Sequence, residues 1–572
     1  MRKFALLTSA LAAVTVLAGL LWWASQPFVA PTTIAARHLA VTANPYASQA
    51  AQEILRKGGS AVDAAIAAQL VLTLVEPQSS GIGGGLFLLV SDAQGNMRVY
   101  DGRETAPAAV RPDLFLGQNR QPRQLDEVST GGLAVGVPGA VAALALAHKQ
   151  YGALPWGELF GPAIRHAEAG FIVSPLLARA IASLDRKRAD TSMQIYFHID
   201  GSPIGAGERI RDPQLTATLR KIAREGPPGF YEGEIAQAIV ASVRSTKRNP
   251  GGMTLDDLRN YRALERDPIC RLFKEYRVCT TPSPSGGVTV LQILGMLEDK
   301  PAEVLATGTL SQVHLMSQAE RLAYSDRAKW LADPDYVKIP AKGLLDESYL
   351  RSRAKLIDAA RDMGYVEAGI PPEKETGLID FAPHRTKTLH GTSHLAIVDK
   401  SGLVVSMTSS VQAAFGAQIR AAGFVLNNEL TDFSLEPIID QQPVANAPAP
   451  GKRPLSAMSP SIIFDPQGRF FAAIGSPGGR EIIAYNAQAL VNLIAAKASI
   501  SSVVSVPHFA NENGSTLLEK GTSLITQIPS LLMMGHSPRF RELESGLNGI
   551  RRSGGAYEAA SDVRGEGAAA GD

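Results

Sequence analysis

Two hydroxyl side chains in the second half of the chain are placed to meet across a β-hairpin. Residues 393–398 and 403–408 are rich in strand-forming types, and the Asp-Lys-Ser-Gly tetrapeptide before the second run is typical of a tight turn. If its Asp and Gly close the turn, Thr392 faces Ser409, and a register one residue longer places it beside Ser410. Threonine is an ordinary strand residue, so this pairing alone does not identify a catalytic nucleophile.

The sequence around this threonine carries a long, ordered set of short motifs. In chain order they are residues 80–85 (SGIGGG), 102–107 (GRETAP), 230–233 (FYEG), 284–287 (PSGG), 324–327 (YSDR), 391–394 (GTSH), 410 and 412 (Ser and Gln), 415–416 (FG), 426–433 (LNNELTDF), 453–456 (RPLS) and 475–479 (GSPGG). The set resembles the γ-glutamyltransferase (γ-glutamyl transpeptidase) family over about residues 38–490.

The resemblance implies an N-terminal nucleophile hydrolase, which is made as one inactive chain and cuts itself before its catalytic threonine. The expected cut is at the Gly391–Thr392 bond, between a large piece, residues 36–391, and a small piece, residues 392–572. The freed α-amino group of Thr392 can act as the base for its own hydroxyl, and the glycine before it leaves the scissile carbonyl accessible. The implied fold is α+β, a four-layer αββα sandwich that the two pieces form as one domain.

The resemblance also assigns catalytic roles. Thr392 would form a γ-glutamyl ester, and Ser410 would hydrogen-bond this nucleophile where the family usually has a threonine. Gly478 and Gly479 would offer backbone N–H groups to the tetrahedral oxyanion, which a side chain there would obstruct.

Four further side chains would bind the glutamyl group. Arg103 would hold the α-carboxylate as a planar fork, with a hydrogen bond added by Ser456. Asp432 and Glu429 would accept from the α-ammonium. Such a pocket is specific for a zwitterion.

The sequence departs from the family pattern in this pocket. Gln412 replaces the usual Asn, and Ala457 replaces the second of two adjacent serines. The lost hydrogen bond would cost about 0.5–1.5 kcal/mol of binding. Residues 434–451, which cover the pocket in many relatives, are short, contain four prolines and no aromatic residue, and predict a more open site.

The expected activity is that of a γ-glutamyltransferase acting on glutathione and other γ-glutamyl amides, with water or an amino acid or peptide as acceptor. The mechanism needs no metal or organic cofactor, and the two pieces would remain together as a heterodimer. One alternative is a related cephalosporin (glutaryl) acylase, whose substrates lack the α-ammonium. A second is a non-catalytic exported relative that folds without processing.

Several helices, and one strand preceded by a glycine-rich segment, must position the candidate site residues. Residues 47–56 and 60–74 read as helices separated by two glycines, with Ser60 as N-cap and Asp63 in the first turn. The glycine run at 81–85 opens a strand rather than a helix, so it is not a phosphate loop. It indicates backbone packed too closely for a Cβ atom.

The remaining pattern predicts more helices and a C-terminal tail. Helices are expected over residues 158–169 with a kink at the proline, 176–184, 256–263, 288–298 and 310–329, and after a turn within 131–146. Residues 553–572, rich in Gly, Ala and Ser, read as a tail.

The first 35 residues are an export signal or an N-terminal anchor. A basic start is followed by an uncharged, mostly apolar run at 4–23, which is the layout of a secretory signal but is also long enough to span a bilayer. Either interpretation places the body outside the cytoplasm, in a bacterial periplasm.

Composition excludes several classes of protein. A length of 572 residues alone would allow three or four domains, whereas the resemblance implies one. A net charge of +2 gives no overall basic field for nucleic acid, and two cysteines exclude a disulfide scaffold.

Cys270 and Cys279 flank two short predicted strands, so a cross-hairpin disulfide and two independent thiols both stay open.

Overall fold

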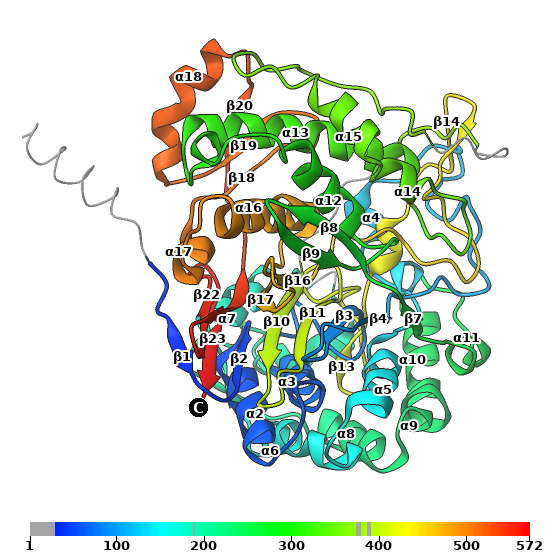
Figure 1. Ribbon diagram of the computed structural model, residues 1–572. Helices are drawn as coiled ribbons and strands as arrows, with labels where there is room; N and C mark the ends of the chain where they lie inside the picture. Colours follow the sequence, from blue (N-terminus) through cyan, green and yellow to red (C-terminus); the bar gives the residue numbers. More distant parts are fainter. Residues whose placement is uncertain (1–28, 187–188, 373–378, 386–390) are drawn as a thin grey trace, which may run out of the picture.

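Two antiparallel sheets face each other at the centre of the molecule (Figure 1). The computed structural model describes residues 29–186, 189–372, 379–385 and 391–572, and each of these sheets has seven strands within them. The first sheet has the order β23 (Ala568–Gly571), β2 (Leu39–Thr42), β10 (Thr392–Val398), β11 (Val404–Ser410), β3 (Gly85–Ser91), β4 (Met97–Asp101) and β7 (Leu264–Arg266). The second has the order β1 (Thr33–Ala35), β22 (Ala556–Ser561), β21 (Asn548–Ser553), β17 (Phe470–Gly475), β16 (Ser461–Phe464), β9 (Tyr276–Thr280) and β8 (Ile269–Phe273).

Helices cover both outer faces, so the predicted αββα layering is confirmed (Figure 1). The first sheet is covered by α2 (Pro45–Arg56), α3 (Ala61–Val75) and α5 (Ala140–Tyr151), with α6 (Gly161–Ala169), α7 (Pro175–Ser183), α8 (Pro213–Glu225), α9 (Pro228–Tyr231), α10 (Gly233–Ser245) and α11 (Leu255–Arg259) further out. The second is covered by α12 (Gly287–Met296), α16 (Ile482–Ile494) and α17 (Ile500–Ser505), with α13 (Leu310–Trp330), α14 (Ala341–Leu344), α15 (Glu347–Ala354) and α18 (Ile528–Met533) beyond them. Smaller elements complete the described chain: α4 (Leu125–Val128), β5 (Phe171–Ile172), β6 (Arg209–Ile210), β12 (Arg420–Ala421), β13 (Phe424–Val425), β14 (Ile438–Ile439), β15 (Gln442–Pro443), β18 (Phe509–Ala510), β19 (Thr516–Glu519) and β20 (Pro538–Arg541).

The strand that begins at Thr392 is buried on both faces. Ala396 and Val398 of β10 enter the core between the two sheets, while Leu395 and Ile397 enter the core against the helices. Because both faces are covered, all seven residues of β10 are buried, and the strand does not show the apolar–polar alternation of a half-exposed one.

The glycine run before β3 allows close backbone packing, as the sequence predicts. A Cβ at Gly84 would lie 2.0 Å from the backbone oxygen of Ser410, and one at Gly83 would lie 2.0 Å from that of Val425. The helix before this run, α3, begins at the predicted cap: Ser60 and Asp63 form a capping box. The run therefore lets the start of β3 lie directly against the end of β11.

Two predictions about the elements are wrong. The expected C-terminal tail forms β22 and β23. These strands pair with β1 and β2, which are distant in sequence, and local composition gives no information about such pairing. Pro162 does not kink a helix within 158–169; it lies in the first turn of α6, after a separate 3₁₀ turn over Trp156–Phe160. Proline is tolerated in a first turn because its missing N–H has no partner there.

The predicted export segment lies almost wholly outside the residues that the structure describes. Among residues 29–186, 189–372, 379–385 and 391–572, no helix is long and apolar enough to cross a membrane.

Candidate active site

A bulged turn sets the partner of Thr392. In the turn, the Gly402 N–H donates to Asp399 O at 3.1 Å and the Asp399 N–H donates to Leu403 O at 3.1 Å, with Gly402 at a φ of 84°. This left-handed glycine adds one residue to the second strand, as in a G1 bulge. The register therefore pairs Thr392 with Ser410, one residue beyond simple closure of the turn by Asp399 and Gly402.

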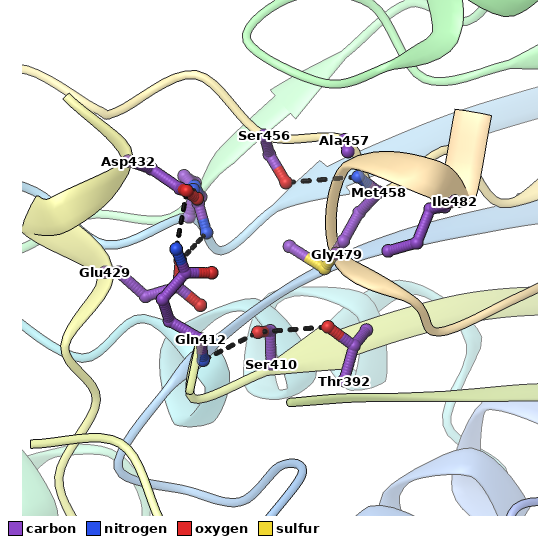
Figure 2. Close-up of a pocket in the computed structure, with 11 residues that line it drawn as sticks. Thr392, Ser410, Gln412, Glu429, Asp432, Ser456, Ala457, Met458, Gly479 and Ile482 are labelled. Atoms are coloured by element: carbon purple, nitrogen blue, oxygen red, sulfur yellow. Dashed lines mark hydrogen bonds and ion pairs between the residues drawn. The ribbon is translucent and has the colours of Figure 1, made fainter. Parts of the chain in front are cut away.

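The Ser410 hydroxyl connects Thr392 to the bond before it. Thr392 Oγ1 donates to Ser410 Oγ at 3.3 Å (Figure 2). Ser410 Oγ in turn donates to the backbone oxygen of Gly391 at 2.8 Å. The Gln412 N–H donates to the same Ser410 oxygen at 2.8 Å. In this intact chain the nucleophile candidate and the adjacent carbonyl therefore share one hydroxyl.

Gly391 occupies a position with no room for a side chain. A Cβ there would lie 2.7 Å from both the carbonyl carbon and the oxygen of Ala413, and 2.9 Å from Gln412 O. All three are backbone atoms, which cannot rotate away as a side chain can. Only glycine fits before Thr392 without a shift of the chain.

These residues open on a small cavity of about 10 Å³ (Figure 2). This volume holds about one water molecule. The cavity is lined by Arg103, Thr392, Ser410, Gln412, Glu429, Asp432, Ser456, Ala457, Met458, Gly479 and Ile482. Tertiary folding thus brings together predicted residues from four distant parts of the sequence.

Of the predicted residues, Gly478 does not line this cavity. It lies next to Gly479, and both have left-handed backbone, with φ of 132° and 61°. None of residues 434–451 lines it either. That segment instead supports the wall, because Asn446 donates to Asp432 O at 2.7 Å and accepts from the Leu455 N–H at 3.1 Å.

The polar wall of the cavity is built from one guanidinium and two carboxyl groups, and a third carboxyl group contacts the guanidinium without lining the cavity. Arg103, which is 1% exposed, donates to Glu429 and to Asp432, and its Nη1 lies 3.5 Å from Oε2 of Glu104. Asp432 also accepts from Nε2 of Gln412 at 2.6 Å. The predicted recognition residues therefore contact one another.

Burial shifts the ionisation of this wall. It raises the pKa of Glu429 to about 7, against the lowering effect of Arg103. Burial and the nearby Glu429 raise the pKa of Glu104 well above its usual range. The three carboxyl groups in turn raise the pKa of Arg103, although its own burial opposes the charge.

Sequence reasoning missed three residues here. Glu104 is fully buried beside Arg103, and Met458 and Ile482 form an apolar wall opposite the carboxylates (Figure 2). Glu104 lies within the quoted 102–107 motif, and Met458 lies two residues beyond the 453–456 motif, so the motifs located both without giving them a role. Ile482 lies at the start of α16, which follows the 475–479 motif.

His394 is a packed residue of strand β10. It is 1% exposed, and its Nδ1 lies 2.8 Å from Thr408 Oγ1. Burial lowers the pKa of this imidazole to about 3, so the ring stays neutral at pH 7.

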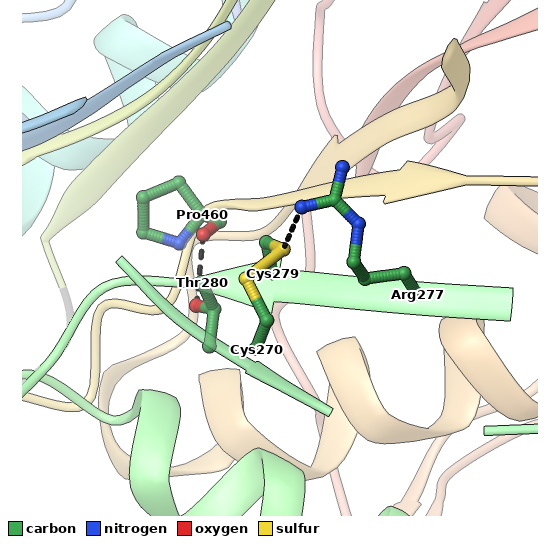
Figure 3. Close-up of a disulfide and its surroundings, with 5 residues drawn as sticks. All are labelled: Cys270, Arg277, Cys279, Thr280 and Pro460. Atoms are coloured by element: carbon green, nitrogen blue, oxygen red, sulfur yellow. Dashed lines mark hydrogen bonds between the residues drawn. A yellow bond between two sulfur atoms is a disulfide. The ribbon is translucent and has the colours of Figure 1, made fainter. Parts of the chain in front are cut away.

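Cys270 and Cys279 form a disulfide on neighbouring strands at the edge of the second sheet (Figure 3). The two residues are direct cross-strand partners in β8 and β9, with Cα atoms 4.1 Å apart. The thiols are thus paired rather than independent. The pair lies in a different sheet from Thr392.

Residues 47–572 match the sequence family described as Gamma-glutamyltranspeptidase. The chain belongs to the γ-glutamyltranspeptidase family. Among its relatives is the glutathione hydrolase proenzyme of Escherichia coli (strain K12), which is 35% identical over 477 residues, 82% of this chain and 79% of the relative. Another is the acylase ACY 1 proenzyme of Pseudomonas sp. (strain SE83), 33% identical over 90% of this chain and 89% of the relative.

Solved structures of γ-glutamyltranspeptidase relatives share the fold. A cephalosporin acylase from Bacillus halodurans has a TM-score of 0.84 at 27% identity, covering 96% of this chain and 98% of that one. The γ-glutamyltranspeptidase of Pseudomonas nitroreducens, complexed with L-DON, has a TM-score of 0.52 at 33% identity, covering 56% of this chain and 94% of that one. The fold is the αββα sandwich of the N-terminal nucleophile hydrolases, as the motifs led us to expect.

Proposed function

We propose that this γ-glutamyltranspeptidase cuts itself at Gly391–Thr392 and then hydrolyses or transfers the γ-glutamyl group of glutathione and related amides. The observation that carries the proposal is the Thr392–Ser410–Gly391 hydrogen-bond chain at the edge of a cavity with carboxylates on its far wall. The relatives named glutathione hydrolase proenzyme support the same chemistry.

Self-cleavage begins with attack of Thr392 Oγ1 on the carbonyl carbon of Gly391. The hydroxyl loses its proton, and a tetrahedral oxyanion forms on Gly391 O, to which Ser410 already donates. Collapse breaks the C–N bond, transfers the proton to nitrogen and leaves an ester; water then hydrolyses the ester to a Gly391 carboxylate and a free Thr392. The absence of a Cβ at Gly391 keeps that carbon in reach.

Turnover uses the new amino terminus. The α-amino group of Thr392 takes the hydroxyl proton as Oγ1 attacks the γ-carbonyl carbon of the donor. The leaving amine takes that proton, and a γ-glutamyl ester of Thr392 remains. Water or the amine of an acceptor resolves the ester, and the proposed donors to the oxyanion are the backbone N–H groups of Gly478 and Gly479.

Denaturing electrophoresis with mass spectrometry tests both steps. We expect two pieces from the wild type, the smaller beginning at Thr392, and one uncut chain from Thr392→Ala, because no other hydroxyl replaces Oγ1. Thr392→Ser keeps a hydroxyl and should still be cut, more slowly. A Thr392→Ala chain cut at the same bond, or a cut wild type that is inert on γ-glutamyl-4-nitroanilide, would contradict the proposal.

A second candidate, a glutaryl-type acylase, is favoured by Ala457 and by the acylase relatives. Its donor would place a carboxylate without an ammonium against Glu429 and Asp432, which is electrostatically unfavourable. Faster turnover of glutaryl-4-nitroanilide than of the γ-glutamyl anilide would select this candidate.

We propose export to the periplasm for the mature enzyme. The apolar run at residues 4–23 and the Cys270–Cys279 disulfide both suit an oxidising compartment outside the cytoplasm. Mass spectrometry of the large piece recovered from the periplasm would distinguish a cleaved leader from a retained anchor.

A further inference from the structure

We infer that Tyr485 is a positioning residue for turnover, whose ring holds the backbone of Gly478 and Gly479 in place. This inference rests on the proposed function, in which these two glycines donate to the oxyanion, and adds a residue outside the 475–479 motif. Three features carry it: the contact of the ring with Gly478, the packing that holds the ring, and the separation of this contact from the bond that is cut.

The Tyr485 ring lies against the backbone of Gly478. Tyr485 is fully buried near the start of α16. A Cβ on Gly478 would lie 2.5 Å from Cε2 and 3.0 Å from Cδ2 of this ring, and 2.9 Å from the backbone oxygen of Glu544. The ring and the Glu544 carbonyl therefore fill the space on the side of Gly478 where a side chain would point.

Two consecutive glycines need such a contact if their N–H groups are to keep one direction. Glycine has the widest choice of backbone conformations, and both glycines here have positive φ. Gly479 begins the 3₁₀ turn Gly479–Glu481, which leads into α16, whereas Gly478 precedes that turn. An oxyanion site works because its donors are fixed before the charge develops. The Tyr485 ring supplies a fixed surface for Gly478.

The Tyr485 ring is itself held by packing. Its centroid lies 4.4 Å from that of the buried His508 ring, with 33° between the planes. Nδ1 of His508 lies 2.9 Å from Oε1 of Gln488, which is three residues after Tyr485 in α16, and the His508 N–H donates to Glu519 at 2.7 Å. The Tyr485 hydroxyl has no hydrogen-bond partner among the residues that the structure describes. The aromatic ring, not the hydroxyl, therefore makes the contact with Gly478.

Self-cleavage and turnover place their oxyanions at different points. In the proposed self-cleavage the charge forms on Gly391 O, to which Ser410 donates. In turnover it forms on the donor's carbonyl oxygen, which would accept from Gly478 and Gly479. The β10–β11 hairpin belongs to the first sheet, whereas α16 covers the second. Loss of the Tyr485 ring should therefore impair turnover and spare self-cleavage.

Two substitutions in the full chain test the inference. Tyr485→Leu removes the ring and should be cut at the wild-type rate, with kcat on γ-glutamyl-4-nitroanilide lowered about ten- to a hundredfold and KM changed less than about threefold, because the displaced donors act mainly in the transition state. Tyr485→Phe keeps the ring and loses only an unpaired hydroxyl, so its kcat should stay within about twofold of wild type. Rates are divided by the amount of cleaved chain measured on gels.

Phe273→Leu is a matched control. Phe273 is equally buried in the same core cluster but lies on β8. Thermal unfolding should show a similar loss of stability for Phe273→Leu and Tyr485→Leu, while kcat per cleaved chain should stay at the wild-type value for Phe273→Leu.

The outcomes separate this inference from the proposed function. A kcat for Tyr485→Leu that matches wild type, or that falls only as far as that of Phe273→Leu, would overturn the inference and leave γ-glutamyl transfer intact. Uncut chains from both Tyr485→Leu and the bulkier Tyr485→Met would show a general structural role and would also overturn it. A wild type that is uncut, or inert on the anilide, would overturn the proposed function itself.

Discussion

The buried carboxyl of Glu429, a proposed donor-binding group, should make donor binding depend on pH near neutrality. Its pKa is raised to about 7, so it is neutral below that pH and charged above it. Only the charged form pairs with an ammonium, so kcat/KM for γ-glutamyl-4-nitroanilide should rise as the pH increases through about 7. Initial rates at low donor concentration between pH 5 and pH 9 measure this directly.

The α-amino group that the proposed cleavage would free on Thr392 should also titrate near this range, so a control is needed. Glu429→Gln retains that amine and removes the carboxyl. The part of the pH dependence that the variant loses therefore reports Glu429. Identical profiles for the two proteins, after scaling, would show that Glu429 does not govern donor binding.

At the scale of the element, the bulged turn of the β10–β11 hairpin aligns the nucleophile candidate with its partner. Gly402→Ala would place a Cβ at a left-handed φ, 3.2 Å from Cβ of Ala93. We expect about 1 kcal/mol of lost stability and slower self-cleavage, because the register that joins Thr392 to Ser410 depends on this turn. Thermal unfolding and a time course of chain cleavage on gels measure the two effects.

The hairpin of β16 and β17 supplies a matched control. Its turn repeats the same bonds, from Asp465 N–H to Arg469 O and from Gly468 N–H to Asp465 O, with Gly468 at a φ of 77°. Gly468→Ala should cost similar stability without slowing cleavage, since this hairpin does not carry Thr392. Equal slowing in both variants would mean that general destabilisation, not register, is responsible.

At the scale of the whole molecule, both sheets combine strands from the two sides of the proposed cleavage site. In the first sheet β2 lies between β23 and β10, and in the second β9 pairs with β16. Backbone ladders therefore cross from one piece to the other in each sheet. Cleavage at residue 391 breaks none of these hydrogen bonds, so the pieces should stay associated.

The C-terminal strand tests this arrangement. Deleting residues 567–572 removes β23, its ladder with β2 and the Asp572–Arg56 ion pair, and keeps Arg564 with its ion pairs to Glu519 and Asp562. We expect the free energy of unfolding to fall by about 2–5 kcal/mol, from several lost backbone hydrogen bonds and an exposed strand edge. Asp572→Asn removes the charge that contacts Arg56 and His38 but keeps the β23 ladder, so it should shift the urea midpoint much less than the deletion does. Coincident urea transitions for the deletion and the wild type would contradict a structural role for β23.

Sequence alone determined the features that depend on local chemistry or on motif content. The capping box of Ser60, the close packing of the glycine run and the family itself followed from residue types at short spacing. A cap hydrogen bond or a missing Cβ acts within a few residues, so each can be predicted from the residue types at neighbouring positions. The candidate residues from Arg103 to Gly479 were named in the same way.

Only the tertiary structure decided how those residues contact one another. The one-residue bulge that selects Ser410, the ion pairs of Arg103 with Glu429 and Asp432, and the pairing of residues 568–571 with β2 all join segments whose partners are not set by their own sequence. A segment with the composition of residues 553–572 stays irregular without a partner strand and becomes a strand when a partner is available. Such pairings are decided by burial and by the competition of distant groups for the same hydrogen bonds, which no local pattern records.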